Sequence, residues 1–163
     1  MNPKKLIQDI GNSSLSRQER MYRLLVTLGL VGLAAGIAAG AVAGENINNL
    51  LAMILALAVI FGITYFTIGY RKIQLGAVLI AFLIIYFMLP YNFLTGGGIY
   101  GGGPIWFMFG VVFVCLVVEK KIKYVLIVSS FFICAVCYYI AYFYPEVIAA
   151  HTIQMAYVDS FAT

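Results

Sequence analysis

The sequence predicts an all-α integral membrane protein: a bundle of five transmembrane helices with a cytoplasmic N-terminus and an outside C-terminus. Three observations predict this class: the composition, a series of long apolar runs, and a one-sided distribution of Lys and Arg. Of the 163 residues, 64% are hydrophobic and 10% are charged, and the mean hydropathy is +1.02. A soluble domain averages about 45–50% apolar and about 25% charged residues. Because this chain has too little polar surface for water, its expected surroundings are a lipid bilayer, as a multi-pass protein of the cytoplasmic membrane.

The apolar residues fall into five runs, and a helix of about 20 apolar residues crosses the hydrocarbon core. A basic cytoplasmic tail is predicted at residues 1–23, and an outer segment, or the start of a missing sixth helix, at 144–163. Pro90 is expected to close the third span, while Pro104 and Trp106 are typical of the start of the fourth. The predicted spans are 24–43, 50–68, 73–89, 105–118 and 125–143.

The basic residues indicate the orientation. All ten lie before the first run, between the second and third, or between the fourth and fifth: Lys4, Lys5, Arg17, Arg20, Arg23, Arg71, Lys72, Lys120, Lys121 and Lys123. If the chain crosses the membrane at each run, these residues share one side. Cytoplasmic loops collect Lys and Arg, so that side is predicted to be cytoplasmic. The same placement accounts for the net charge of +4 without a nucleic-acid partner.

The first run has a second interpretation. Arg23, an apolar stretch and then Ala41-Val42-Ala43 resemble a signal peptide with its cleavage site. However, the polar lead exceeds twenty residues, and the apolar stretch is long enough to span the membrane. The sequence therefore favours an anchored helix over a cleaved one.

The first span carries four glycines at four-residue spacing, Gly32, Gly36, Gly40 and Gly44, which we call the glycine stripe. Residues four apart lie on one helix face. Small residues let two membrane helices approach closely, and such packing drives helix association in lipid. The stripe is therefore predicted to be a helix-packing face. Its partner is either another helix of this chain or a second copy in a homodimer.

The most unusual segment is the glycine-rich loop, residues 90–104, between the third and fourth spans. It contains G-x-G-x-x-G at Gly96, Gly98 and Gly101, but not the strand and acidic residue of a dinucleotide fold. The glycines permit either sharp turns or close contact between backbone amides and a ligand. The candidate signal-sensing residues are Tyr91, Asn92, Gly97, Tyr100, Gly102 and Trp106.

No catalytic or metal-binding constellation is evident in the sequence. The acidic residues lie at span ends, whereas ion pathways need polar groups at membrane depth. Cys134 and Cys137 form C-x-x-C inside an apolar run without a visible partner, so they are interpreted as small hydrophobic residues. His151 is interpreted as a surface residue. We therefore expect no enzymatic activity, no cofactor and no metal.

Residues 82–159 contain a distinctive combination of motifs. They are Leu89-Pro90, the segment 93–107, the Glu119-Lys120-Lys121 turn, the end of the fifth span at Tyr142-Phe143-Tyr144-Pro145-Glu146-Val147, and Asp159. Together they resemble a block in the N-terminal membrane domains of clostridial signalling proteins. These are sensor histidine kinases of two-component systems and diguanylate cyclases with a GGDEF output domain.

The resemblance implies a non-catalytic sensor, or input, domain that transmits an outside signal through its last helix to a cytoplasmic output domain. The sequence departs from that family pattern, because it ends where the sixth helix would begin and contains no kinase or cyclase segment. The alternative is a stand-alone membrane protein that regulates or scaffolds a partner membrane protein. A transporter is a weaker alternative.

Overall fold

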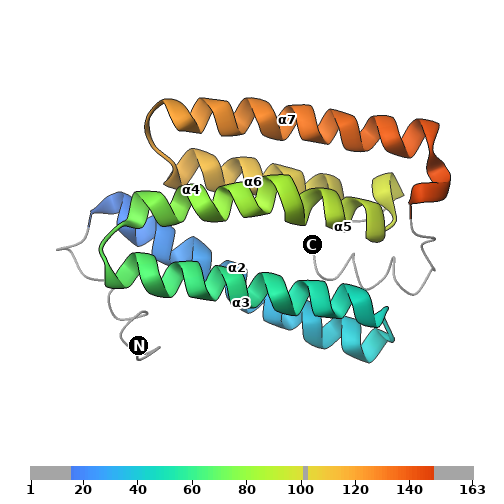
Figure 1. Ribbon diagram of the computed structural model, residues 1–163, viewed down its shortest axis with the longest axis horizontal. Coiled ribbons are helices and arrows are strands. Elements are labelled where there is room, and N and C mark those ends of the chain that lie inside the picture. The colour runs from blue at the N-terminus through green and yellow to red at the C-terminus, as the bar shows by residue number, and fades with distance from the viewer. Residues whose placement is uncertain (1–15, 101–102, 149–163) are drawn as a thin grey trace.

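The computed structural model describes residues 16–100 and 103–148, and this part of the chain contains helices and no strand. Four helices are long and apolar enough to cross a membrane, at Arg17–Val42, Ile47–Gly69, Ile73–Thr95 and Lys120–Phe143, and a shorter apolar helix lies at Ile105–Val117. The chain is thus a helical membrane protein, as its composition predicts. The elements, shown in Figure 1, are α2 (Arg17–Ala43), α3 (Ile47–Gly69), α4 (Ile73–Leu83), η1 (Ile84–Met88), α5 (Leu89–Thr95), η2 (Gly98–Tyr100), α6 (Gly103–Val117), α7 (Lys120–Phe143) and η3 (Pro145–Val147).

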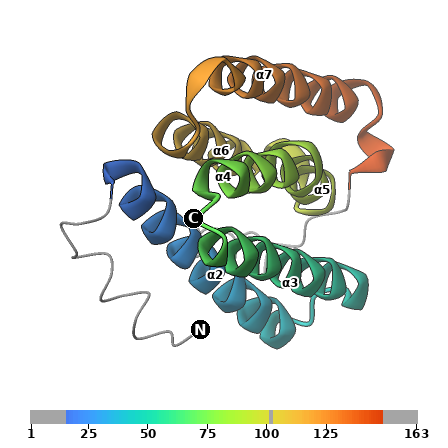
Figure 2. The ribbon, with the colours of Figure 1, turned by 60° about the vertical axis from the view of Figure 1, so that its left-hand side comes forward.

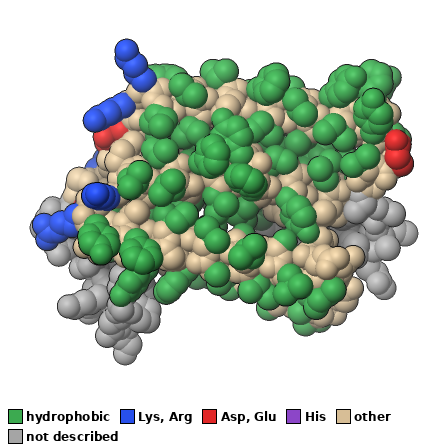
Figure 3. Space-filling view, in the orientation of Figure 1, with side chains coloured by type: hydrophobic (Ala, Val, Ile, Leu, Met, Phe, Trp, Pro, Cys, Tyr) green, Lys and Arg blue, Asp and Glu red, His purple; other side chains and the backbone are tan. Residues whose placement is uncertain are grey.

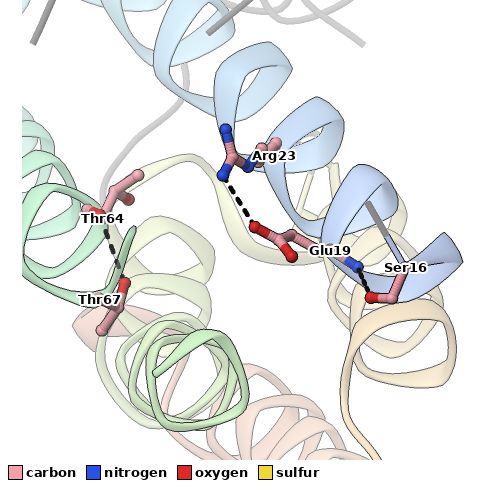
Figure 4. A network of polar contacts seen from close by, with 5 residues as sticks. All are labelled: Ser16, Glu19, Arg23, Thr64 and Thr67. Atoms are coloured by element: carbon pink, nitrogen blue, oxygen red, sulfur yellow. Dashed lines mark hydrogen bonds and ion pairs between the residues drawn. The ribbon is translucent and has the colours of Figure 1, made fainter. Parts of the chain in front are cut away.

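Helix α2 begins at Arg17 rather than at residue 24, where the apolar run starts. Ser16 caps the helix, because its hydroxyl accepts a hydrogen bond from the Glu19 backbone N–H at 3.1 Å. One turn later the Arg23 guanidinium pairs with Glu19 at 2.8 Å (Figure 4). The last residues assigned to the basic tail are therefore the first turns of the first long helix.

The third long apolar helix continues past Pro90 to Thr95, whereas the predicted third span ends at about residue 89. The five residues before α5 form a π-helical turn, η1, in which the Leu89 N–H bonds the Ile84 carbonyl. Proline has no N–H, and in an α-helix its ring collides with the carbonyl four residues earlier. A π turn is a known site of local helix distortion. We attribute the continuation to this widened turn, which accommodates the proline without ending the helix.

The helices form two groups, which both views of the ribbon separate (Figures 1 and 2). One group is the antiparallel pair α2 and α3. The other contains α4, η1, α5, α6 and α7. Contacts of α2 with α6 and α4, and of α3 with α4, join the two groups. The main buried cluster lies where the groups meet and includes Tyr22, Ala77, Ile80 and Val114. A smaller cluster of Leu89, Phe93, Phe107 and Cys137 holds α5, α6 and α7 together.

The described Lys and Arg residues gather at one end of the bundle (Figure 3). The start of α2, the α3–α4 turn and the α6–α7 turn all lie there, and we call it the basic end. The opposite end, called the loop end, carries the α2–α3 turn and the glycine-rich loop. The predicted one-sided charge pattern is thus present in the fold, while Lys4 and Lys5 lie outside the described residues.

Gln18 ties three helices together at the basic end. Its side-chain amide donates to Gln74 Oε1 on α4 at 2.7 Å and to the Val117 carbonyl on α6 at 2.6 Å. The Val117 carbonyl is one of the groups that the end of α6 leaves without a helical partner. A single amide nitrogen with two hydrogens makes both bonds. Sequence inspection missed this residue because it lies outside the apolar runs.

We expect Gln18→Ala to lower the free energy of unfolding by about 0.5–2 kcal/mol, the range found for hydrogen bonds between membrane helices. The measurement is thermal unfolding of the purified protein in detergent. Arg17→Ala is the matched control, because Arg17 is the exposed neighbour in the same turn. Equal melting temperatures for the two variants would show that Gln18 does not link the helices.

Candidate ligand cavity

A cavity of about 270 Å³ lies between the two helix groups, and the space-filling view shows a hollow there (Figure 3). Residues from α2, α3, the helix run 73–95 and α6 line it. Most lining side chains are apolar, and Glu45, Asn92 and Thr95 are the polar ones. The lining residues are Leu25, Val26, Gly29, Gly32, Leu33, Gly36, Ala39, Gly40, Glu45, Met53, Ile60, Ile80, Ile84, Met88, Leu89, Asn92, Thr95, Gly96, Trp106, Phe109, Gly110 and Phe113.

The glycine stripe forms the α2 wall of this cavity over much of its length. A Cβ placed at Gly32 would have no atom within 4 Å, so this residue faces open space. At Gly36 a Cβ would lie 3.1 Å from Met53 Cε on α3, and at Gly40 it would lie 3.2 Å from Leu50 Cδ2. Gly32, Gly36 and Gly40 thus line the cavity, and Gly36 and Gly40 also approach α3. Whether it also packs against a second copy stays a prediction.

Gly44 differs from the other three glycines of the stripe because it ends helix α2. It caps α2 in the left-handed conformation with φ of +73°, and its N–H donates to the Gly40 carbonyl. The following N–H, of Glu45, donates to the same carbonyl at 2.9 Å. This arrangement is a common glycine helix end. It reverses the chain and aims the next side chain back along α2.

The Glu45 carboxylate consequently lies over Gly40 and lines the cavity. Its Oε2 atom is so close to Gly40 that a Cβ there would collide with it. Its other oxygen, Oε1, accepts a hydrogen bond of 3.3 Å from the Asn49 amide. The sequence places Glu45 merely at a span end; the structure turns it inward. The sequence signal for this inward direction is a helix-ending glycine, Gly44, directly before the acid, together with Gly40 five residues before the acid.

Three of the predicted sensing residues lie at the loop end of the cavity or at its rim. Asn92 and Trp106 line the cavity, from α5 and α6 respectively. Tyr91 lies beside them, and its hydroxyl donates to Asn49 Oδ1 on α3 at 2.8 Å. This bond joins the two helix groups at the loop end, opposite the packed residues of the basic end.

The remaining sensing residues do not line the cavity. Gly97 is buried with φ of +84°, a conformation that favours glycine. Gly98 follows with φ of +62°, and a Cβ there would lie 3.1 Å from Ile148 Cγ2, so the loop lies against the segment after α7. Tyr100 ends η2, and Gly102 lies outside the described residues.

Phe93 fixes the start of the loop. Its side chain is fully buried, and its ring contacts Phe107 of α6 and Tyr138 of α7 at centroid distances of 6.3 and 5.5 Å. Such edge and tilted ring pairs stabilise beyond the area they bury. Packed side chains of α5, α6 and α7 therefore support the start of the loop.

The lining of the cavity is mostly apolar, with a few polar side chains. Within residues 16–100 and 103–148, no group of three or more His, Cys, Asp or Glu side chains lies close enough to hold a metal ion. The three cysteines are free, with Cys115 exposed, Cys134 half-buried and Cys137 buried. An apolar chamber with a few polar groups at one end is the usual form of a small-molecule site.

Comparison with models of protein families, with curated proteins and with solved structures gives no match.

Proposed function

We propose that this chain is a non-catalytic membrane input domain of a bacterial signalling protein, of the sensor histidine kinase or diguanylate cyclase kind. The observation that carries the proposal is a ligand-sized cavity between two helix groups, which are in direct contact at the basic end and joined by the Tyr91–Asn49 hydrogen bond at the loop end. If the protein has conformations that differ in the distance between the groups, a ligand that binds one conformation more tightly increases the population of that conformation. The resemblance of the loop and following helices to clostridial sensor domains adds support.

The proposed direction of signalling runs from the loop end to the basic end. At the basic end the groups are in direct contact, because Tyr22 of α2 and Thr67 of α3 both meet Gly76 of α4. At the loop end they are separated by the cavity and joined by the Tyr91–Asn49 bond. The basic end acts as a pivot, and a change at the loop end changes the angle between the groups.

We further propose that the basic end is cytoplasmic and the loop end is outside. In a variant with its three cysteines replaced by alanine, we expect a membrane-impermeant maleimide added to intact cells to label Glu146→Cys but not Lys72→Cys. Both positions are exposed in the fold, so burial does not explain a difference. Labelling of Lys72→Cys alone would reverse the proposed orientation.

The sensor proposal is tested with the full chain joined, through an added apolar helix, to a cytoplasmic kinase output domain. We expect Gly97→Val and Tyr91→Phe to change kinase output relative to the parent fusion, because one strains the loop and the other removes the bond across the groups. Ile99→Val, an exposed position in the same loop, is the control. Unchanged output from correctly inserted Gly97→Val and Tyr91→Phe fusions would contradict the proposal.

A further inference from the structure

We infer that the cavity binds an amphipathic amine, with its protonated amino group at Glu45 and its apolar chain along the glycine stripe. The inference starts from the polar groups that line the cavity. Glu45 Oε2 has no hydrogen-bond donor in the described part of the chain, and neither has the Asn92 side-chain oxygen. Both groups line the same cavity.

The Glu45 carboxylate is half-buried beside apolar helices, and a donor or a cation that faces it lowers the cost of removing its charge from water. Among the described residues, the one donor to Glu45 is the Asn49 amide at 3.3 Å, which is longer than the usual charge-assisted hydrogen bond of about 2.7–2.9 Å. A bound ammonium group, which has three N–H donors, supplies a charge-assisted partner for the free carboxylate oxygen.

The charge distribution excludes the opposite kind of head group. The described Lys and Arg residues lie at the basic end (Figure 3), so no described cation is placed to receive a phosphate or sulfate at the loop end. Trp106 lines the cavity from α6, with Phe109 at a ring-centroid distance of 6.0 Å. Aromatic faces attract ammonium groups. Carboxylate, amide oxygen and indole together favour a cation with hydrogen-bond donors.

The shape of the cavity defines the rest of the ligand. Its α2 wall extends from Leu25 to Gly40 and is made of glycines and apolar side chains. At 1.5 Å per residue this length is roughly 22 Å, which accommodates one extended alkyl chain. Because no atom lies within 4 Å of the position that a Gly32 Cβ would take, the alkyl chain of the ligand has free space beside α2.

The test uses the full chain in lipid nanodiscs and its own fluorescence. The sequence contains one tryptophan, Trp106, which lines the cavity, so its emission reports on this site. The probes are decylammonium, decanol and decyl sulfate, compared at equal probe-to-lipid ratios. We expect a saturable change in emission with decylammonium and only a small linear change with the other two.

Glu45→Gln keeps the shape of the side chain and removes its charge. We expect it to weaken decylammonium binding roughly tenfold to a hundredfold, in line with the loss of a hydrogen bond to a charged group. Glu146→Gln is the control, since Glu146 is an exposed acid outside the cavity. Equal responses to all three probes, or unchanged binding in Glu45→Gln, would overturn the inference.

The role of this amine as a signal rests on the proposed function, whereas its binding does not. The kinase fusion separates the two. Binding that depends on Glu45 without any change in kinase output would contradict the sensor proposal and leave the site in place. If Glu45→Gln changes kinase output but the parent protein does not bind decylammonium, the amine site is contradicted and the sensor proposal stands.

Discussion

Gly76→Val should lower the free energy of unfolding by about 3 kcal/mol or more, the upper end of the range for inserting atoms into a packed core. Gly76 of α4 is buried where α2, α3 and α4 converge. A Cβ there would lie 2.5 Å from Thr67 Oγ1 and 2.6 Å from the Tyr22 hydroxyl. These distances are well below van der Waals contact, so at least two helices must move apart.

The two neighbours cannot yield easily, because hydrogen bonds fix them. Thr67 Oγ1 donates to the Ile63 carbonyl at 2.7 Å, which leaves it as the acceptor for the Tyr22 hydroxyl at 3.1 Å. Tyr22 is fully buried. Moving either side chain therefore breaks a buried hydrogen bond in addition to disturbing the packing.

Thermal unfolding in detergent measures the effect of Gly76→Val, with Gly62→Val as the matched control. Gly62 lies in the middle of α3, and its missing Cβ has no atom within 4 Å. A second comparison uses coupling between contacting residues. Gly76→Ala should cost less in a Tyr22→Phe background, because the hydroxyl that obstructs the new methyl group is gone. Equal costs in both backgrounds would place the strain elsewhere.

The parts of the fold that are predictable from sequence are those set by local composition. Each apolar run became a helix because a backbone in lipid must satisfy its own hydrogen bonds. The end of the third helix was missed at Pro90, because the π turn that accommodates it depends on neighbouring residues and has no signature of its own. The early start of α2 depends on Ser16 and Glu19, two polar residues before the apolar run.

The cavity was not predictable, because it depends on the distance between two helix groups. A glycine stripe looks the same in sequence whether it meets another helix, as at Gly36, or open space, as at Gly32. The position of the Glu45 side chain in the cavity was not predictable, because the left-handed cap at Gly44 sets the direction of that side chain. Asn92 and Trp106 were identified from the unusual loop composition, and the fold brings both to the cavity that the stripe borders.

Gly32→Leu should abolish decylammonium binding and leave the protein as stable as the parent or more stable. The new side chain enters empty space, because no atom lies within 4 Å of the Gly32 Cβ position. Leucine also has a higher helix propensity than glycine, by roughly 1 kcal/mol. The substitution therefore fills the chamber from the α2 wall without straining the helices around it.

Gly62→Leu is the control, since it makes the same exchange at an α3 position that does not line the cavity. Both variants should keep or raise the melting temperature, but only Gly32→Leu should lose the saturable Trp106 response. If the stripe instead packs against a second copy at Gly32, the leucine would disrupt a dimer. Size-exclusion chromatography with light scattering distinguishes these cases: an unchanged mass with lost binding indicates a filled cavity, whereas a halved mass indicates a packing face.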